Sequence, residues 1–136
     1  MMSKVIWQVA SILLLLIGVG HLAGTLFTTL LHPVNNKLME DMKVSPINVD
    51  TKAIIWKAWI GFNATFATCL IFIALTNFYL AYQHFDLLKG FSALSMATVL
   101  CTFFLSWIAH KYLIKKVTRI FLIAFILFVI AMILSR

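Results

Sequence analysis

The stretch VIWQVASILLLLIGVGHLAGTLFTTLL, residues 5–31, contains no Asp, Glu, Lys or Arg. A helix needs about 20 consecutive apolar residues to cross the hydrocarbon core of a bilayer, and this stretch is long enough. Three more apolar stretches follow near residues 53–82, 90–110 and 118–135. Because the later connections are short, successive helices should be antiparallel neighbours. We therefore expect an all-α fold: an integral membrane four-helix bundle with antiparallel up-down topology, in a single transmembrane domain over residues 1–136.

The composition favours a membrane protein and argues against a nucleic-acid partner. Hydrophobic residues make up 63% of the chain and charged residues 11%, whereas soluble domains have about 25% charged residues. The formal net charge is +7, but the basic residues lie at the ends of the apolar stretches, where anionic lipid head groups are the expected counter-charge. Cys69 and Cys101 lie inside apolar stretches and should pack as small hydrophobic side chains.

The ends of the first two spans are predicted from local signals. The first stretch begins like a secretory signal, but it continues well past His21, so we expect a retained span. Pro33 lacks an amide hydrogen and disfavours helix in the preceding residue, which predicts that the first helix ends near His32. Residues 33–52 form a polar surface loop with room for a short helix. The N-cap expected for the second span is Asp50 or Thr51.

The distribution of Lys and Arg predicts the orientation of the spans. The side with both termini and the second connection carries three of them: Lys4, Lys89 and Arg136. The other side carries eight: Lys37, Lys43, Lys52, Lys57, Lys111, Lys115, Lys116 and Arg119. Basic residues accumulate on the cytoplasmic side, so we expect the first and third connections in the cytoplasm and both termini outside. Aromatic residues near the span ends fit an interfacial belt: Trp7, Trp56, Trp59, Tyr82, Trp107 and Tyr112.

Polar side chains inside the apolar stretches indicate a candidate site. At about 100° per residue, His21, Thr25, Thr28 and His32 share one face of the first helix. An ionisable ring deep in a span is costly and by default marks function. Asn63 in the second span and Thr102 in the third lie at a depth similar to that of His21. We therefore predict a polar pocket open toward the cytoplasmic side, with five ligand-binding residues: His21, Thr25, Trp59, Asn63 and Thr102.

Helix packing is the main alternative explanation for these polar residues. Asn, Ser and Thr in membrane helices commonly bond across helices or to their own backbone carbonyls. A bis-histidine haem would need two rings at one depth, and only His32 with His110 could meet that condition. No carboxylate lies inside a span, which argues against a metal site. A path for ions through the membrane would require an oligomer. The sequence identifies no cofactor.

The second span carries a resemblance to a known family. Its sequence WKAWIGFNA, residues 56–64, resembles the signature of a family of small, uncharacterised bacterial four-helix integral membrane proteins with a WxAWIGFN-type second helix. Further elements of the resemblance are Met42, Lys43, Ser45, Pro46 and Thr51 upstream, and Gly20, His21, Leu22 and Thr25 in the first span. The family often has a histidine where this chain has Phe66. The resemblance implies the fold and a location in a bacterial inner membrane but no particular reaction.

Three functions stay open on these grounds. The first is an intramembrane polar pocket for a small lipophilic ligand, anchored by His21 and Asn63. The second is an accessory or structural subunit of a larger membrane complex, which fits the small size and the apolar fourth span. The third is a membrane enzyme in which His21 acts as a general acid or base on a lipid-like substrate. The expected partner is the lipid bilayer, with a homo-oligomer or a partner membrane subunit left open.

Overall fold

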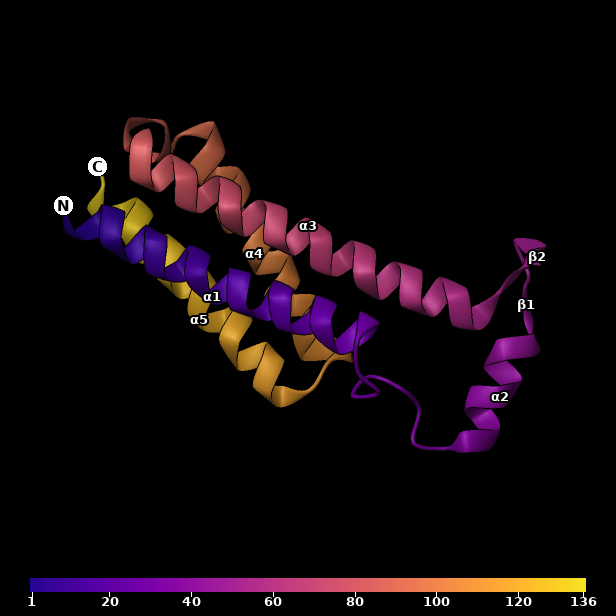
Figure 1. The fold of residues 1–136 in the computed structure, drawn as a ribbon. Coiled ribbons are helices and arrows are strands. Elements are labelled where there is room, and N and C mark those ends of the chain that lie inside the picture. The colour runs from indigo at the N-terminus through magenta and orange to yellow at the C-terminus, as the bar shows by residue number, and fades with distance from the viewer. The chain divides into compact units, whose positions relative to one another are not determined.

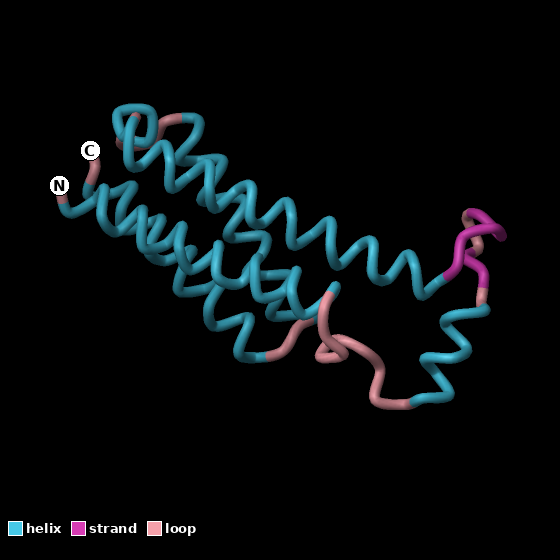
Figure 2. The backbone as a smooth tube through the Cα atoms, in the orientation of Figure 1, coloured by secondary structure: helices cyan, strands magenta, loops and turns pink.

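The computed structural model describes residues 1–136, and most of them are helical (Figure 1). Its elements are α1 (Met2–Leu26), α2 (Asn36–Val44), β1 (Pro46–Ile47), β2 (Asp50–Ile54), α3 (Ile55–Gln83), the 3₁₀ helix η1 (Phe85–Leu88), α4 (Ala93–Tyr112) and α5 (Lys115–Leu134). Four helices, α1, α3, α4 and α5, are long and apolar enough to cross a membrane. The predicted helical class is confirmed, and the one exception is the short β1–β2 hairpin, which Figure 2 shows in magenta.

The chain divides into two compact units. Unit 1 combines residues 1–17 with residues 70–136, and unit 2 consists of residues 18–69. Each of the helices α1 and α3 therefore contributes one part to each unit. The single transmembrane domain expected from the sequence stays a prediction.

Unit 1 has a core of small and aromatic side chains. Only Leu113 and Ile114 separate α4 from α5, and these two helices pack side by side in opposite directions (Figure 1). On α5 the fully buried residues recur at helical spacing: Phe121, Ala124, Phe128 and Ala131. On α4 the buried stripe is polar, with Ser95, Thr98, Thr102 and Ser106. Small side chains let the helix backbones approach closely, which is how helices associate without a hydrophobic driving force between them.

A hydrogen-bonded group at the centre of unit 1 joins three helices. Trp7 Nε1 of α1 donates to Asn77 Oδ1 of α3 at 3.1 Å, and Thr98 Oγ1 of α4 donates to the same oxygen at 2.9 Å. Trp7 is fully buried, and its ring packs edge-on against Phe128 with centroids 4.9 Å apart. Trp7 therefore faces the core of unit 1, and its depth in a bilayer stays a prediction. A buried indole needs a partner for its N–H, and Asn77 supplies one inside the core.

One end of unit 1 is held by contacts between segments far apart in sequence. Lys4 Nζ donates to the backbone carbonyl of Tyr82 at 2.8 Å, and the Gly90 N–H donates to Ser135 Oγ at 3.0 Å. Asp86 forms an ion pair with Lys89 at the same end. The hydrogen bond from Lys89, and then its charge, hold the pKa of Asp86 below its ordinary value.

The first helix ends earlier than the sequence predicted. α1 ends at Leu26, and not near His32. Thr28 Oγ1 donates to the Gly24 carbonyl at 2.9 Å and accepts from the Leu30 N–H at 3.1 Å. These local side-chain bonds compete with the backbone ladder of the helix. Thr28 and His32 consequently lie beyond the helix and do not continue the stripe that begins at His21.

The start of the second span also differs from the prediction. α3 begins at Ile55, and Asp50 and Thr51 lie in β2. β1 and β2 pair antiparallel, with Pro46 opposite Ile54. Asp50 Oδ1 accepts a hydrogen bond from the Lys52 N–H at 2.9 Å, within the strand. The N-cap prediction is therefore wrong, because the capping-type side chain is used to shape the hairpin.

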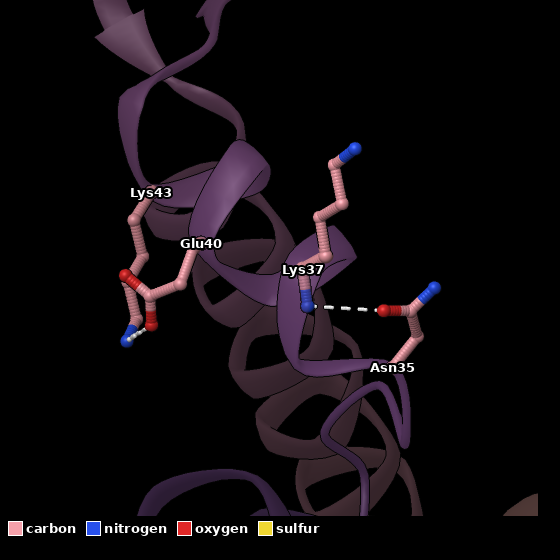
Figure 3. A network of polar contacts seen from close by, with 4 residues as sticks. All are labelled: Asn35, Lys37, Glu40 and Lys43. Carbon is pink, nitrogen blue, oxygen red and sulfur yellow. Dashed lines mark hydrogen bonds and ion pairs between the residues drawn. The ribbon is translucent and has the colours of Figure 1, made fainter.

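The short helix expected in the polar loop is present as α2. Figure 3 shows Asn35 as its N-cap, where Oδ1 accepts from the Lys37 N–H at 3.0 Å. The Leu38 N–H donates to the same oxygen at 3.3 Å. Lys43 and Glu40 form an exposed ion pair one turn apart, at 2.8 Å. No residue of α2 is buried, so this helix is held mainly by its own local interactions.

Candidate functional site

The candidate site lies in unit 2, where the last part of α1 meets the first part of α3. His21 Nε2 of α1 lies 3.0 Å from Asn63 Oδ1 of α3. Asn63 Nδ2 donates in turn to the backbone carbonyl of Trp59, one helical turn earlier, at 2.7 Å. Two residues from distant parts of the sequence are thus joined, and the second of them is tied to its own helix backbone.

This chain of hydrogen bonds determines which nitrogen of His21 carries the hydrogen. Since the amide nitrogen of Asn63 donates to a carbonyl, its oxygen faces His21, and that oxygen can only accept. In the neutral ring Nε2 must therefore be the N–H, which leaves Nδ1 with a lone pair. Within unit 2, Nδ1 makes no hydrogen bond. His21 is thus held in one orientation with a hydrogen-bond acceptor to spare.

Aromatic side chains pack against His21 and against one another in unit 2. The ring of Phe66 packs edge-on against His21, with centroids 5.5 Å apart. Trp59 stacks almost parallel on Trp56 at 5.6 Å, and His32 packs edge-on against Trp56 at 4.8 Å. Phe66 thus gives His21 an apolar neighbour on one side.

The five residues predicted for the site fall into two groups. His21, Asn63, Trp59 and Thr25 lie together in unit 2, and Thr25, 2% exposed, donates from Oγ1 to the His21 carbonyl at 2.8 Å. Thr102 belongs to unit 1, where its buried hydroxyl donates to the Thr98 carbonyl at 2.9 Å. A hydroxyl that bonds the backbone of its own helix is typical of residues that serve helix packing. The part of Thr102 in a ligand site stays a prediction.

Sequence reasoning did not find the second polar group, formed by Trp7, Asn77 and Thr98. Asn77 carries the same signal as Asn63, an amide inside an apolar stretch. The geometry separates them: Asn77 receives two hydrogen bonds at its oxygen and has both partners inside unit 1. Asn63 instead bonds an ionisable ring. The first arrangement is complete as a packing element, and the second leaves an acceptor free.

A cavity of about 430 Å³ lies elsewhere in unit 2. It is lined by the hairpin residues Ile47, Val49, Asp50 and Ala53 and by Ala58, Gly61, Phe62 and Thr65 of α3. The α3 residues recur at helical spacing on a different face from Asn63. This cavity is therefore separate from the His21 group. The chain contains no cluster of three or more His, Cys, Asp or Glu side chains able to hold a metal ion.

Comparison with known protein families, with curated proteins and with solved structures gave no match to this chain. The resemblance of the second span to a bacterial membrane-protein family therefore stays an expectation from the sequence.

Proposed function

We propose that this chain is a multi-pass protein of the bacterial inner membrane that binds a small lipophilic ligand at His21 and Asn63. The proposed arrangement is a four-helix bundle of up-down topology, with the first and third connections in the cytoplasm. The observation that carries the proposal is the chain from His21 through Asn63 to the Trp59 carbonyl. It holds an ionisable ring in a fixed orientation inside an apolar segment, and such residues are rare in membrane helices unless they act in function.

The chemistry of the site suggests the class of ligand. The free Nδ1 of His21 accepts a hydrogen bond, so the ligand should carry a hydroxyl or an N–H. The ring of Phe66 packs against His21, and such an apolar surface suits an apolar or aromatic body. A lipophilic phenol or alcohol has both features, whereas a plain hydrocarbon has only the second.

A pair of matched probes tests this proposal. 4-Octylphenol and octylbenzene differ by one hydroxyl, and we expect the phenol to raise the thermal midpoint of the protein in mild detergent more strongly. One hydrogen bond of about 1 kcal/mol corresponds to roughly fivefold tighter binding. His21→Gln places an amide N–H near Nε2 and removes the Nδ1 acceptor, so it should abolish the preference. Thr68→Val removes only an exposed hydroxyl that bonds its own helix outside this group, and it serves as the control.

Two results would contradict the proposal. The first is equal stabilisation of the wild-type protein by both probes, and the second is a preference that survives in His21→Gln. The same ring with a free lone pair is also the arrangement a general base requires. The enzyme alternative therefore shares this site, and it adds the requirement that a hydroxylated lipid-like substrate be turned over.

A further inference from the structure

A cleft at the turn between α4 and α5 is lined by basic side chains. It has a volume of about 300 Å³ and is formed by His110, Leu113, Lys115, Thr118 and Arg119. Thr118 fixes its geometry, because Oγ1 donates to the Ala109 carbonyl of α4 at 2.9 Å. The first turn of α5 is thereby joined to the last turn of α4. All these residues belong to unit 1.

An apolar groove continues from this basic cleft. It has a volume of about 250 Å³, and it shares His110 and Thr118 with the cleft. Its walls are Phe103 and Trp107 of α4 with Leu122 and Phe125 of α5. The rings of Phe103 and Phe125 lie with centroids 5.8 Å apart. Cleft and groove together form one elongated site that is basic at one end and apolar along the rest.

The basic residues at this turn have no acidic partner within unit 1. Asp86 is the sole acidic residue of the unit, and it pairs with Lys89 before the start of α4. At about 1.5 Å per residue, the length of α4 puts that pair roughly 30 Å from the turn. Lys111 lies over the rings of Trp107 and Tyr112, whereas Lys115 and Arg119 face the cleft. An anion that pairs with Lys115 and Arg119 would therefore come from outside the unit.

The first turns of α5 also favour a bound anion. Its first turns carry Lys115, Lys116 and Arg119, it has no acidic residue in the first turn, and its N-cap Ile114 offers no side-chain hydrogen bond. Cations at the positive end of a helix dipole are unfavourable. An anion in the cleft would remove that cost for the residues that line it.

We propose that this site binds one anionic phospholipid, with its phosphate between Lys115 and Arg119 and an acyl chain along the groove. The order of a basic cleft followed by an apolar groove matches the order of head group and chain in such a lipid. Trp107 and Tyr112, both more than half exposed, lie beside the cleft as interfacial aromatic residues do. This inference rests on the proposed membrane location and is independent of the ligand proposed for His21.

The test compares two charge-matched double variants. Lys115→Gln with Arg119→Gln removes two charges that line the cleft, and Lys111→Gln with Lys116→Gln removes two from the same turn that do not line it. Binding of phosphatidylglycerol and phosphatidylcholine is measured for the full chain in detergent by native mass spectrometry. With about 1 kcal/mol per basic residue near an anionic surface, the first variant should lose at least about tenfold of the preference for phosphatidylglycerol. The second variant should retain most of it.

Three outcomes would overturn this proposal. Equal losses in the two double variants would show general charge attraction, and no loss in either would show that the cleft is not used. Inorganic phosphate that displaces phosphatidylglycerol at comparable concentration would point to a soluble anion. Unchanged thermal midpoints of both variants in phosphatidylcholine verify that they fold. The response of His21→Gln to 4-octylphenol is independent of all three outcomes.

Discussion

At the residue scale, the two asparagines of α3, Asn63 and Asn77, have different roles. Asn77 is the common acceptor for Trp7 and Thr98, and Asn63 positions His21. Both are amides in an apolar sequence, so composition alone does not distinguish them. Their partners do, because Asn77 ties three helices together while Asn63 presents an ionisable ring.

Replacement of Asn77 by Leu should destabilise the protein. The change leaves the buried N–H of Trp7 without an acceptor, and the expected loss of unfolding free energy is about 1–2 kcal/mol. Thr98→Val removes a single interhelical bond and should cost about 0.6 kcal/mol. Unfolding by SDS in mixed micelles measures both. Thr68→Val, which removes an exposed hydroxyl bonded to its own helix, should have almost no effect, and a cost equal to that of Asn77→Leu would refute this role.

The hydrogen position on His21 is directly measurable. Nitrogen-15 NMR of histidine-labelled protein at a pH where the ring is neutral should show His21 as the Nε2–H tautomer. Asn63→Leu removes the acceptor and should shift the ring toward a mixture of tautomers. A predominant Nδ1–H form in the wild-type protein would contradict the proposed arrangement, because Asn63 Oδ1 cannot donate.

At the element scale, composition predicted the four long helices well and their ends poorly. The helices follow from apolar stretches of sufficient length. The end of α1 at Leu26 depends on what the Thr28 hydroxyl bonds, and the hairpin depends on pairing between very short strands. Neither the end of α1 nor the hairpin produces a periodic pattern of hydrophobic residues in the sequence. Similarly, helix geometry predicts that His21 and Asn63 lie at one depth, but the bond from Asn63 to the Trp59 carbonyl depends on side-chain orientation, which the sequence does not encode as a pattern.

The short helix α2 offers a test of local stabilisation. Asn35→Ala removes the oxygen that accepts from the N–H groups of Lys37 and Leu38, and loss of such a cap costs about 1 kcal/mol. Amide hydrogens of residues 39–44 should therefore exchange about fivefold faster by NMR or mass spectrometry. Asn36→Ala changes the next residue without removing the cap and should not accelerate exchange. Because α2 buries no residue, neither variant should alter the global unfolding midpoint.

At the scale of the whole molecule, the orientation in the membrane can be tested with single cysteines. In a background with Cys69 and Cys101 replaced by Ala, Val49→Cys probes the first connection and Leu87→Cys the second, at exposed positions. A membrane-impermeant maleimide should label Leu87→Cys in spheroplasts and Val49→Cys only in inverted vesicles. The opposite pattern would reverse the orientation, and labelling of both from one side would contradict the up-down topology.

The most direct measurement is native mass spectrometry of the wild-type protein and His21→Gln, released side by side from mild detergent. The ligand proposal predicts a retained non-lipid mass on the wild-type chain that is absent from His21→Gln, with the same oligomeric state in both. A wild-type chain with no such mass, or a mass retained equally by His21→Gln, would contradict it. A second protein chain in place of a small molecule would favour the accessory-subunit alternative.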